Sequence, residues 1–421
     1  MIAKINRIFT CTSIPDKLVF LFFTFLILST ILGSLLINLT FILLFIIFTI
    51  DTVINKNYFF LKDITFWILV FYFSTLLINL YFSLDPMNSL LRILKILLMI
   101  SFTMQIKKII QTYPADFEKI IFGFWSIIFS IVIIDILFEM TFGFNTLGFK
   151  SEYPGRIASF SGDELIVGSY FFGLGLLYIG QVSILLNKHK KLLIGVVLIL
   201  IFISLLIGER SNFIKFFIAA SILLFFSTKI NFKGAILVIT IFFITFFSFL
   251  NFNEQIKYRY KTQFLDHDSV KGISSFIKNS LYVAHYDAAF KIFEENPFFG
   301  IGVKNYRFEA HKPKYENEKL SRTGSRGSTH PHQIHFEILS ETGLFGYISF
   351  LILIIFSLYL SIKNYFIYKN VFQLSSAIFI IIFTIPFLPS GSFFSTFPSA
   401  IFWINYAIMM AYNKDDLFIK P

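Results

Sequence analysis

The chain has 421 residues, of which 56% are hydrophobic and 14% charged, with 60 Phe and a formal net charge of +11. Ordinary soluble domains carry roughly 25% charged residues, so a soluble cytosolic enzyme is excluded, because it could not bury this much apolar surface. The apolar residues form continuous blocks close to the ~20 residues that cross a bilayer. They lack the residue-by-residue alternation of a transmembrane β-barrel. We therefore predict an all-α polytopic membrane protein.

The apolar blocks predict about twelve transmembrane helices. In chain order their approximate bounds are 18–33, 35–54, 64–82, 90–106, 119–140, 164–186, 192–207, 212–228, 232–251, 335–361, 371–389 and 398–412. We interpret the first block as a retained span, because it is long and lacks the small-residue cleavage pattern of a signal peptide. The single cysteine, Cys11, can form no intrachain disulfide.

The distribution of basic residues predicts the orientation of these helices. With the N-terminus in the cytoplasm, the inner segments hold seventeen Lys and Arg residues, and the short outer loops hold three. Cytoplasmic loops of membrane proteins carry an excess of Lys and Arg. We therefore expect both termini in the cytoplasm.

Residues 252–334 form a long polar segment on the outer side, between the ninth and tenth spans. Loops of this length are usually functional or form a small domain. The stretch 273–295 contains no Gly or Pro and is expected to be helical, ending at Asn296-Pro297, with Gly300 and Gly302 forming a tight turn. We expect three parts: nine helices in 1–251, a partly helical loop domain in 252–334, and three helices with a cytoplasmic tail in 335–421.

Arginine is distributed differently from lysine. The chain has 28 Lys and 8 Arg, and Arg7 is the one arginine in an inner segment. A guanidinium binds phosphate through two parallel hydrogen bonds, which an ammonium cannot do. The remaining arginines therefore predict an anionic, phosphorylated ligand at the outer face. The alternative is ordinary loop charge.

A cluster of histidines lies where the long loop re-enters the membrane. His330 precedes the tenth span, and His332, His335 and Glu337 are expected in its first turns. A histidine at this interface is a candidate general base near neutral pH. One alternative is that some of these rings only hydrogen-bond loop carbonyls. A second is a zinc site, although the His-Glu-x-x-His spacing is absent.

Two arginines stand in short outer loops, against the charge trend. Arg156 follows Gly155 in the loop before the sixth span, and Arg210 follows Glu209 in a tight turn between two spans. The simple readings are an interfacial anchor for Arg156 and a hairpin with a Glu–Arg pair for Arg210. Together they favour an anion-binding role.

Residues 295–302 (ENPFFGIG), 330–333 (HPHQ) and 337–346 (EILSETGLFG) resemble the O-antigen ligase and polymerase family of bacterial envelope glycosyltransferases. Arg156 with Phe160, and Arg210, fall where that family carries arginines in earlier loops. The likeness covers roughly residues 150–350. The chain differs from the family pattern at Gln333, where Asn is usual, and at Ser159, where Gly is common.

The resemblance implies a GT-C-like, inverting glycosyltransferase in the bacterial inner membrane, with its active site facing the periplasm. It implies no metal or other cofactor, an undecaprenyl-diphosphate-linked glycan as donor, and a sugar acceptor. In such an enzyme Arg156 and Arg210 would hold the diphosphate, His332 would be the base, and His330 would orient His332 or contact the acceptor. His335 and Glu337 would be accessory residues.

Three alternatives concern the overall function. Residues 161–164 favour a polymerase, whose acceptor is another lipid-linked repeat, over a ligase, whose acceptor is the lipid A core. A transporter of the same lipid-linked glycan would need ionisable groups along its span centres and an internal repeat, and neither is evident. A non-catalytic scaffold would leave the placement of arginine and histidine unexplained.

Four charged residues lie near the outer ends of the fourth and fifth spans. Arg92 and Lys95 are three residues apart on one helix, and Asp135 and Glu139 are four apart on the next. Charges within a bilayer are costly unless paired, so we expect an ion-pair cluster, with snorkelling to water as the alternative. If Arg92 is free instead, it becomes a further candidate for binding the diphosphate.

Overall fold

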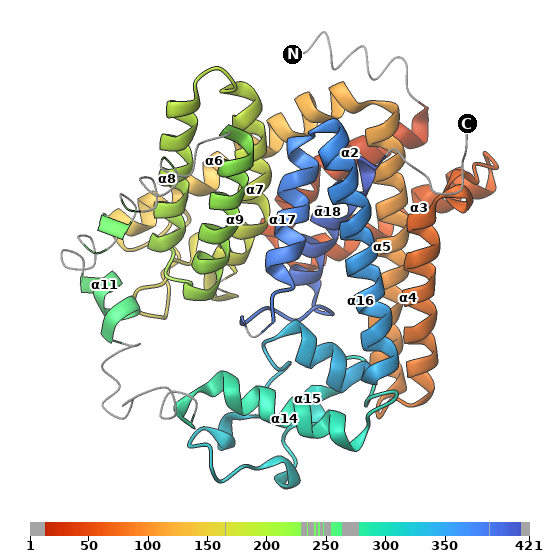
Figure 1. The fold of residues 1–421 in the computed structure, drawn as a ribbon, viewed down its shortest axis with the longest axis vertical. Coiled ribbons are helices and arrows are strands. Elements are labelled where there is room, and N and C mark those ends of the chain that lie inside the picture. Colours follow the sequence, from red (N-terminus) through yellow and green to blue (C-terminus); the bar gives the residue numbers. More distant parts are fainter. Residues whose placement is uncertain are drawn as a thin grey trace. The chain divides into compact units, whose positions relative to one another are not determined.

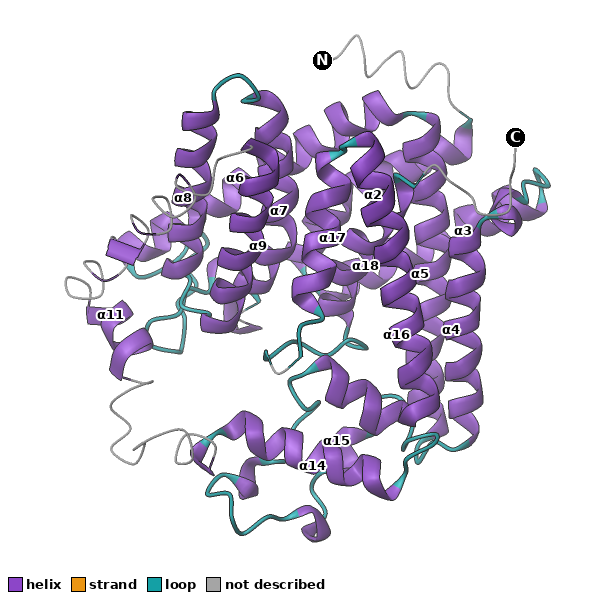
Figure 2. Cartoon of the chain, viewed as in Figure 1, coloured by secondary structure: helices purple, strands orange, loops and turns teal. Residues whose placement is uncertain are grey.

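The computed structural model describes residues 13–164, 166–228, 254–262, 278–386 and 388–413, together with residues 234, 240, 243, 244 and 247. Helices make up 77% of the structure, and the described residues contain no strand (Figure 2). Eight of the described helices are long and apolar enough to cross a membrane. The predicted class, an all-α polytopic membrane protein, is confirmed.

Eleven of the twelve predicted spans correspond to described helices (Figure 1). They are α2 (Ile14–Leu32), α3 (Ser34–Val53), α4 (Ile64–Tyr81), α5 (Pro86–Thr112), α6 (Pro114–Phe142), α7 (Val167–Leu185), α8 (Lys190–Leu206), α9 (Arg210–Thr228), α16 (Ile334–Tyr368), α17 (Val371–Phe383) and α18 (Thr396–Ala411). The ninth predicted span, 232–251, falls almost wholly outside the described residues, and residues 1–12 and 414–421 lie outside them too.

Local chemistry explains where several of these helices begin and end. Asp63 caps α4, its carboxylate accepting the backbone N–H of Thr65 at 2.9 Å. Gly143 ends α6 in a left-handed conformation. Gly33, at φ +115°, separates α2 from α3. α17 ends at Phe383, six residues before the predicted end, because Pro386 disfavours helix in the residue before it.

The helices group into two compact units. The first comprises residues 1–40, 108–267 and 367–382, and the second comprises 41–107, 268–366 and 383–421. This grouping follows packing and interleaves distant segments. The three-part division expected above follows chain order, so it is a different description of the chain.

Unit 1 is built around α2, α6, α7, α8 and α9. α7 packs against α6, α8 and α9, and α2 packs against α6. α17 joins the unit through aromatic contacts, with Phe372 stacked on Phe122 at 4.0 Å between ring centroids and Phe379 against Phe172 at 4.7 Å. The loop from α6 to α7 contains the 3-10 helix η2 (Ser159–Glu164), and Arg259 lies in the short helix η3 (Tyr258–Thr262).

Unit 2 contains α4, α18, most of α3, α5 and α16, and the described part of the long loop. That loop forms α14 (Leu281–Glu295), α15 (Tyr306–Glu309), and the short helices η4 (Pro313–Tyr315) and η5 (Thr323–Ser325). It has its own buried cluster, whose members are Ala288, Ala289, Ile292, Ile301, Tyr306, Ala310 and Tyr315. The predicted helix ends at Glu295 as expected, while residues 263–277, which include its predicted start, lie outside the described residues.

Candidate active site

The turn after α14 is inserted into a break in α16. Gly343, at φ +63°, interrupts the helix, so the N–H groups that follow it need partners outside the helix. Leu344 and Phe345 donate these N–H groups to the carbonyls of Pro297 and Phe298, at 2.7 and 3.1 Å. The two family-like segments, 295–302 and 337–346, therefore hydrogen-bond to each other through their backbone groups.

Glycine is required at this junction because two backbones touch there. A Cβ on Gly300 would lie 2.5 Å from the carbonyl carbon of Glu341, and a Cβ on Gly343 would lie 2.4 Å from that of Phe298. The backbone N–H of Gly302 completes the junction by donating to the Glu341 carbonyl at 2.8 Å. The Gly-x-Gly spacing thus serves a close backbone approach, as well as the tight turn expected from the sequence.

Two buried glutamates of α16 organise the segments around this junction. The Glu341 carboxylate accepts the backbone N–H groups of Lys304 and Tyr306, at 2.7 and 3.3 Å. The Glu337 carboxylate accepts the Ser392 hydroxyl and the Phe393 N–H, the latter at 2.7 Å. Glu337 is therefore a positioning residue for the segment before α18.

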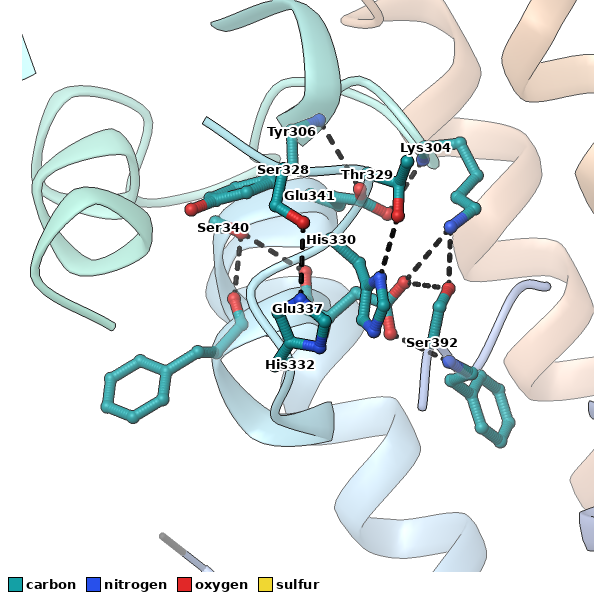
Figure 3. A network of polar contacts seen from close by, with 12 residues as sticks. Lys304, Tyr306, Ser328, Thr329, His330, His332, Glu337, Ser340, Glu341 and Ser392 are labelled. Atoms are coloured by element: carbon teal, nitrogen blue, oxygen red, sulfur yellow. Dashed lines mark hydrogen bonds and ion pairs between the residues drawn. The ribbon is translucent and has the colours of Figure 1, made fainter. Parts of the chain in front are cut away.

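Lys304 joins the same network from the long loop. Its Nζ donates to the Ser392 hydroxyl at 2.6 Å and lies 3.7 Å from the Glu337 carboxylate (Figure 3). Both charged side chains are almost fully buried. Buried charges are tolerated when they are paired and hydrogen-bonded, and this pair ties the long loop, α16 and the segment before α18 together.

His332 is held by both its backbone and its ring. The residue adopts φ +57°, an unusual conformation for a non-glycine residue, and its carbonyl accepts the Ser390 N–H at 2.8 Å. Its Nε2 lies 3.2 Å from the Ser328 hydroxyl (Figure 3). A ring nitrogen that already meets a hydroxyl group is well placed to accept a proton from one.

Two further histidine rings surround His332. The centroid of the His330 ring is 4.2 Å away, and that of the His285 ring is 5.0 Å away. Nδ1 of His285 lies 2.9 Å from the Arg326 carbonyl, which can only accept a hydrogen bond, so this nitrogen carries the proton. Nδ1 of His330 lies 3.0 Å from the Thr329 hydroxyl, and the backbone of Ser390 is close to the same ring.

The environment keeps these rings neutral. Burial lowers the pKa of His332 to about 4, and repulsion from His285 and Lys304 acts in the same direction. Burial lowers the pKa of His330 to about 2, again helped by nearby positive charge. A neutral imidazole has a lone pair free to accept a proton, so His332 is in the protonation state that a base needs at neutral pH.

His335 has an ordinary structural role. Its Nε2 donates to the Thr384 carbonyl at 2.7 Å, and its Nδ1 is 3.0 Å from the Tyr347 hydroxyl, so both nitrogens are occupied. Gln333 caps α16, its side-chain oxygen accepting the N–H groups of His335 and Phe336 at 2.7 and 3.0 Å. The glutamine therefore does the work of a shorter N-cap residue.

In unit 1, the Arg156 side chain reaches the turn formed by residues 207–210, which includes Arg210. Arg156 is 3.4 Å from the Glu209 carboxylate, and Arg210 is the first residue of α9. Burial raises the pKa of Glu209, and Arg156 opposes this. Gly208, at φ +78°, passes so close to Gly155 that a Cβ would lie 1.9 Å from its carbonyl oxygen. The turn and the Arg156 loop are therefore tightly packed.

A third arginine reaches this turn. The Arg259 Nε donates to the Gly208 carbonyl at 2.8 Å, and the neighbouring Tyr260 hydroxyl donates to Leu205 at 3.0 Å. Arg210 and Arg259 both lie close enough to affect the ionisation of Tyr260. Sequence motifs missed this role of Arg259, although the excess of outer arginines included it.

The acidic pair Asp135 and Glu139 has a different role from the one expected. Asp135 accepts the Thr146 N–H at 2.8 Å and the Ser159 hydroxyl at 2.6 Å. Glu139 accepts the N–H groups of Ala158 and Ser159 at 2.9 and 2.5 Å. The predicted ion-pair cluster is therefore wrong for these two residues, because both carboxylates accept hydrogen bonds from the loop that follows α6 in the same unit. These contacts hold the loop that carries Arg156.

The same contacts explain a departure from the family pattern. Ser159 adopts φ +44°, a left-handed conformation that favours glycine. In this chain the serine hydroxyl bonds to Asp135, which helps to hold the residue in that conformation. The side chains of Asp163 and Glu164 lie outside the described residues.

Two other sequence expectations concern a metal and Arg92. The described residues contain no group of three His, Cys, Asp or Glu side chains that could hold a metal ion, so the zinc reading finds no ligand set there. Arg92 lies half-buried on α5 in unit 2.

Residues 194–351 match the family model described as O-antigen ligase. This chain carries an O-antigen ligase family domain. The match confirms the resemblance to the O-antigen ligase and polymerase family, which is a glycosyltransferase-like family of enzymes. It contains Arg210, Arg259, His285 and His332, whereas Arg156 lies before it. No curated protein matches the chain.

Four residues of the O-antigen ligase domain and its surroundings were not singled out by the sequence motifs. They are Arg259, His285, Lys304 and Ser392. The first two belong to residue types already enriched in the outer segments. Lys304 and Ser392 carried no signal, because they meet Glu337 only through contacts between distant segments.

Proposed function

We propose that this O-antigen ligase family protein is an inverting glycosyltransferase. It moves a glycan from undecaprenyl diphosphate to an acceptor hydroxyl at the periplasmic face of the bacterial inner membrane, with both chain termini in the cytoplasm. The observation that carries the proposal is the contact between the neutral His332 ring and a hydroxyl group, that of Ser328, at 3.2 Å. The hydroxyl of an acceptor sugar would take the same place.

The proposed reaction is a single displacement. The acceptor oxygen attacks the anomeric carbon while its proton passes to Nε2 of His332. The bond between that carbon and the phosphate oxygen breaks, and the undecaprenyl diphosphate leaves with the bonding electrons. One displacement inverts the anomeric configuration. The His330 ring, 4.2 Å from that of His332 between centroids, is close enough to orient His332 or to contact the acceptor.

The leaving group carries negative charge, which unit 1 is equipped to bind. Arg156, Arg210 and Arg259 meet at the 207–210 turn, and Arg210 opens α9, whose N-terminal end carries partial positive charge. Arginine supplies both charge and directed hydrogen bonds to phosphate, so we infer that no metal ion is required. Glu209 orients Arg156 through their 3.4 Å contact.

Between the two acceptors, we favour another lipid-linked repeat, so that the protein acts as a polymerase. The resemblance of residues 161–164 to polymerase-type members of the family supports this choice. Transfer to the lipid A core, which would make the protein a ligase, is the second candidate.

Glycan profiling of a deletion strain complemented with variants tests the function. Wild-type protein should restore long polymer, and His332→Ala should not, although it inserts at normal levels. A strain that accumulates lipid A capped with a single repeat identifies a polymerase, and loss of all polymer from lipid A identifies a ligase. His311→Ala, an exposed ring in the same loop, is the matched control and should behave as wild type. Near-normal polymer with His332→Ala would contradict the role of His332 as the base.

A further inference from the structure

Three cations gather beside the turn that leads into α15 in unit 2. Arg92 and Lys95 lie on one face of α5, and Arg307 lies on α15. The same face of α5 is bonded to the turn, since the Asn88 amide donates to the Lys304 carbonyl at 3.3 Å. Arg92 follows Asn88 by one helical turn, and Arg307, just after Lys304 in the chain, lies close enough to Arg92 to repel it.

These cations have no carboxylate partner among the described residues. Several other buried or half-buried cations do have one: Lys107 with Asp63 at 2.6 Å, Lys108 with Asp16 at 2.8 Å, Arg156 with Glu209 at 3.4 Å and Arg326 with Glu316 at 3.1 Å. In the cluster, Arg307 repels Arg92, and Arg92 repels Lys95. The Arg307 Nε is buried and has no hydrogen-bond partner in the described part of the chain.

Uncompensated positive charge at such a place is costly unless an anion binds it. The surroundings add donors that suit a phosphate. Lys95 reaches the Thr396 hydroxyl at 3.0 Å, at the first turn of α18. The N-cap of that helix, Ser395, makes no side-chain cap bond, so amide N–H groups of the first turn remain for an anion.

We propose that Arg92, Lys95 and Arg307 form a second phosphate-binding site, which takes the phosphate or diphosphate group of the acceptor lipid. This inference rests on the proposed function, in which the arginines of unit 1 take the diphosphate of the donor. Each unit then holds one phosphorylated lipid by its own cations. A polymerase needs such an arrangement, because both of its substrates are undecaprenyl diphosphate-linked glycans.

Counting bound lipids by native mass spectrometry tests the site, with undecaprenyl diphosphate as the probe on the purified full chain. Wild-type protein should bind two lipids. The Arg92→Gln/Arg307→Gln variant should bind one, as should Arg156→Gln/Arg210→Gln, and the variant with all four changes should bind none. Arg322→Gln, an exposed arginine of the same loop, should still bind two. The proposal would be overturned if Arg92→Gln/Arg307→Gln still bound two lipids. It would also be overturned if wild-type protein bound only one lipid and each double variant abolished that binding.

Thermal stability separates this site from a structural role. Removing one of three repelling cations should leave the lipid-free Tm of Arg307→Gln equal to or above that of wild type. The rise in Tm on adding undecaprenyl diphosphate should be smaller in the variant. A fall in the lipid-free Tm would contradict the proposal, because it would mean that Arg307 is already paired.

Two further probes identify the acceptor and separate the two proposals. Inorganic pyrophosphate should compete with lipid at both sites if the head group is what binds. Lipid A that displaces one of the two lipids, only in protein with Arg92 and Arg307 intact, would assign the site to a ligase acceptor. If the deletion strain makes normal polymer while two-lipid binding persists, the glycosyltransferase proposal fails and the second site stands.

Discussion

His332 has features that set it apart from the other histidines of the loop. Its backbone is held at φ +57° with its carbonyl bonded to Ser390, and its Nε2 meets a hydroxyl. His335, in contrast, has both ring nitrogens occupied by a carbonyl and a phenol. Three histidines of similar sequence context thus differ in what they can do. The sequence identified the cluster, and only the contacts separate a candidate base from a structural ring.

The lowered pKa of His332 leads to a pH prediction. A base must be neutral, so activity is retained above the pKa and falls as pH drops through it. The acid limb of kcat/KM, which reports the free enzyme, should lie near pH 4. An acid limb near pH 6.5, the ordinary pKa of a histidine, would contradict a buried, neutral ring at His332.

Arg156 and Arg210 differ from lysine in geometry as well as charge. We expect Arg156→Lys and Arg210→Lys each to lower kcat by roughly 10²-fold, the usual effect of losing one directed donor to developing negative charge. The measurement is transfer to a labelled acceptor in detergent. Full activity in either lysine variant would show that charge alone suffices.

At the scale of elements, the break in helix α16 creates the binding position for the turn at residues 297–302 in unit 2. Gly343 interrupts the helix so that the 297–302 turn can bond to its exposed amides and carbonyls. Glu337 and Glu341, both in the part of α16 before the break, then accept hydrogen bonds from N–H and hydroxyl groups of two other segments. The family-like residues thus build a joint that carries the histidine loop.

Substitution of the joint glycines should destabilise unit 2. In Gly343→Ala the backbone at φ +63° and ψ −169°, a conformation that essentially only glycine adopts, costs about 1–3 kcal/mol, and the clash with the Phe298 backbone adds to this. We expect a lower Tm and loss of transfer. Gly324→Ala is the control, because its Cβ would meet nothing within 4 Å. Equal Tm values for the two variants would contradict the role of the joint.

α6 supports the arginine loop of unit 1 in a similar way. Asp135 and Glu139 accept hydrogen bonds from Thr146, Ala158 and Ser159. Asp135→Asn keeps the shape but weakens the charge-assisted bonds, so we expect a rise in KM for the donor with protein levels unchanged. Glu152→Gln, an exposed acid of the same loop, should leave KM unaltered. Equal donor KM values for Asp135→Asn and Glu152→Gln would contradict the proposed positioning role of Asp135.

At the scale of the whole molecule, the apolar helices and the distribution of lysine together predict how the protein sits in the membrane. The connection between α7 and α8 should face the cytoplasm, and the loop between α14 and α16 should face the periplasm. Both carry exposed positions, Lys188 and Gly324, that tolerate a reporter.

The single native cysteine makes this orientation easy to test. In a Cys11→Ser background, Gly324→Cys should react with a membrane-impermeant maleimide in intact spheroplasts, and Lys188→Cys should react only after lysis. The reverse pattern would invert the predicted topology and place the histidines on the cytoplasmic side.

A metal requirement is also a property of the whole enzyme. Because the arginines of unit 1 supply positive charge to the leaving group, transfer should keep its rate in excess EDTA. Strong inhibition that added zinc reverses would contradict the arginine mechanism.

Much of this protein is determined by the sequence alone. Membrane class and eleven of the helices follow from the length of apolar blocks, because crossing a bilayer is a local requirement. The family-like segments and the outer arginines and histidines are equally visible in the sequence. Tertiary structure alone decided which polar groups meet. Asp135 bonds to a loop and needs no cation, Lys304 reaches Ser392 eighty-eight residues away, and His285 of α14 lies against His332 in the loop before α16. Such contacts join residues far apart in the chain, and no local periodicity records them.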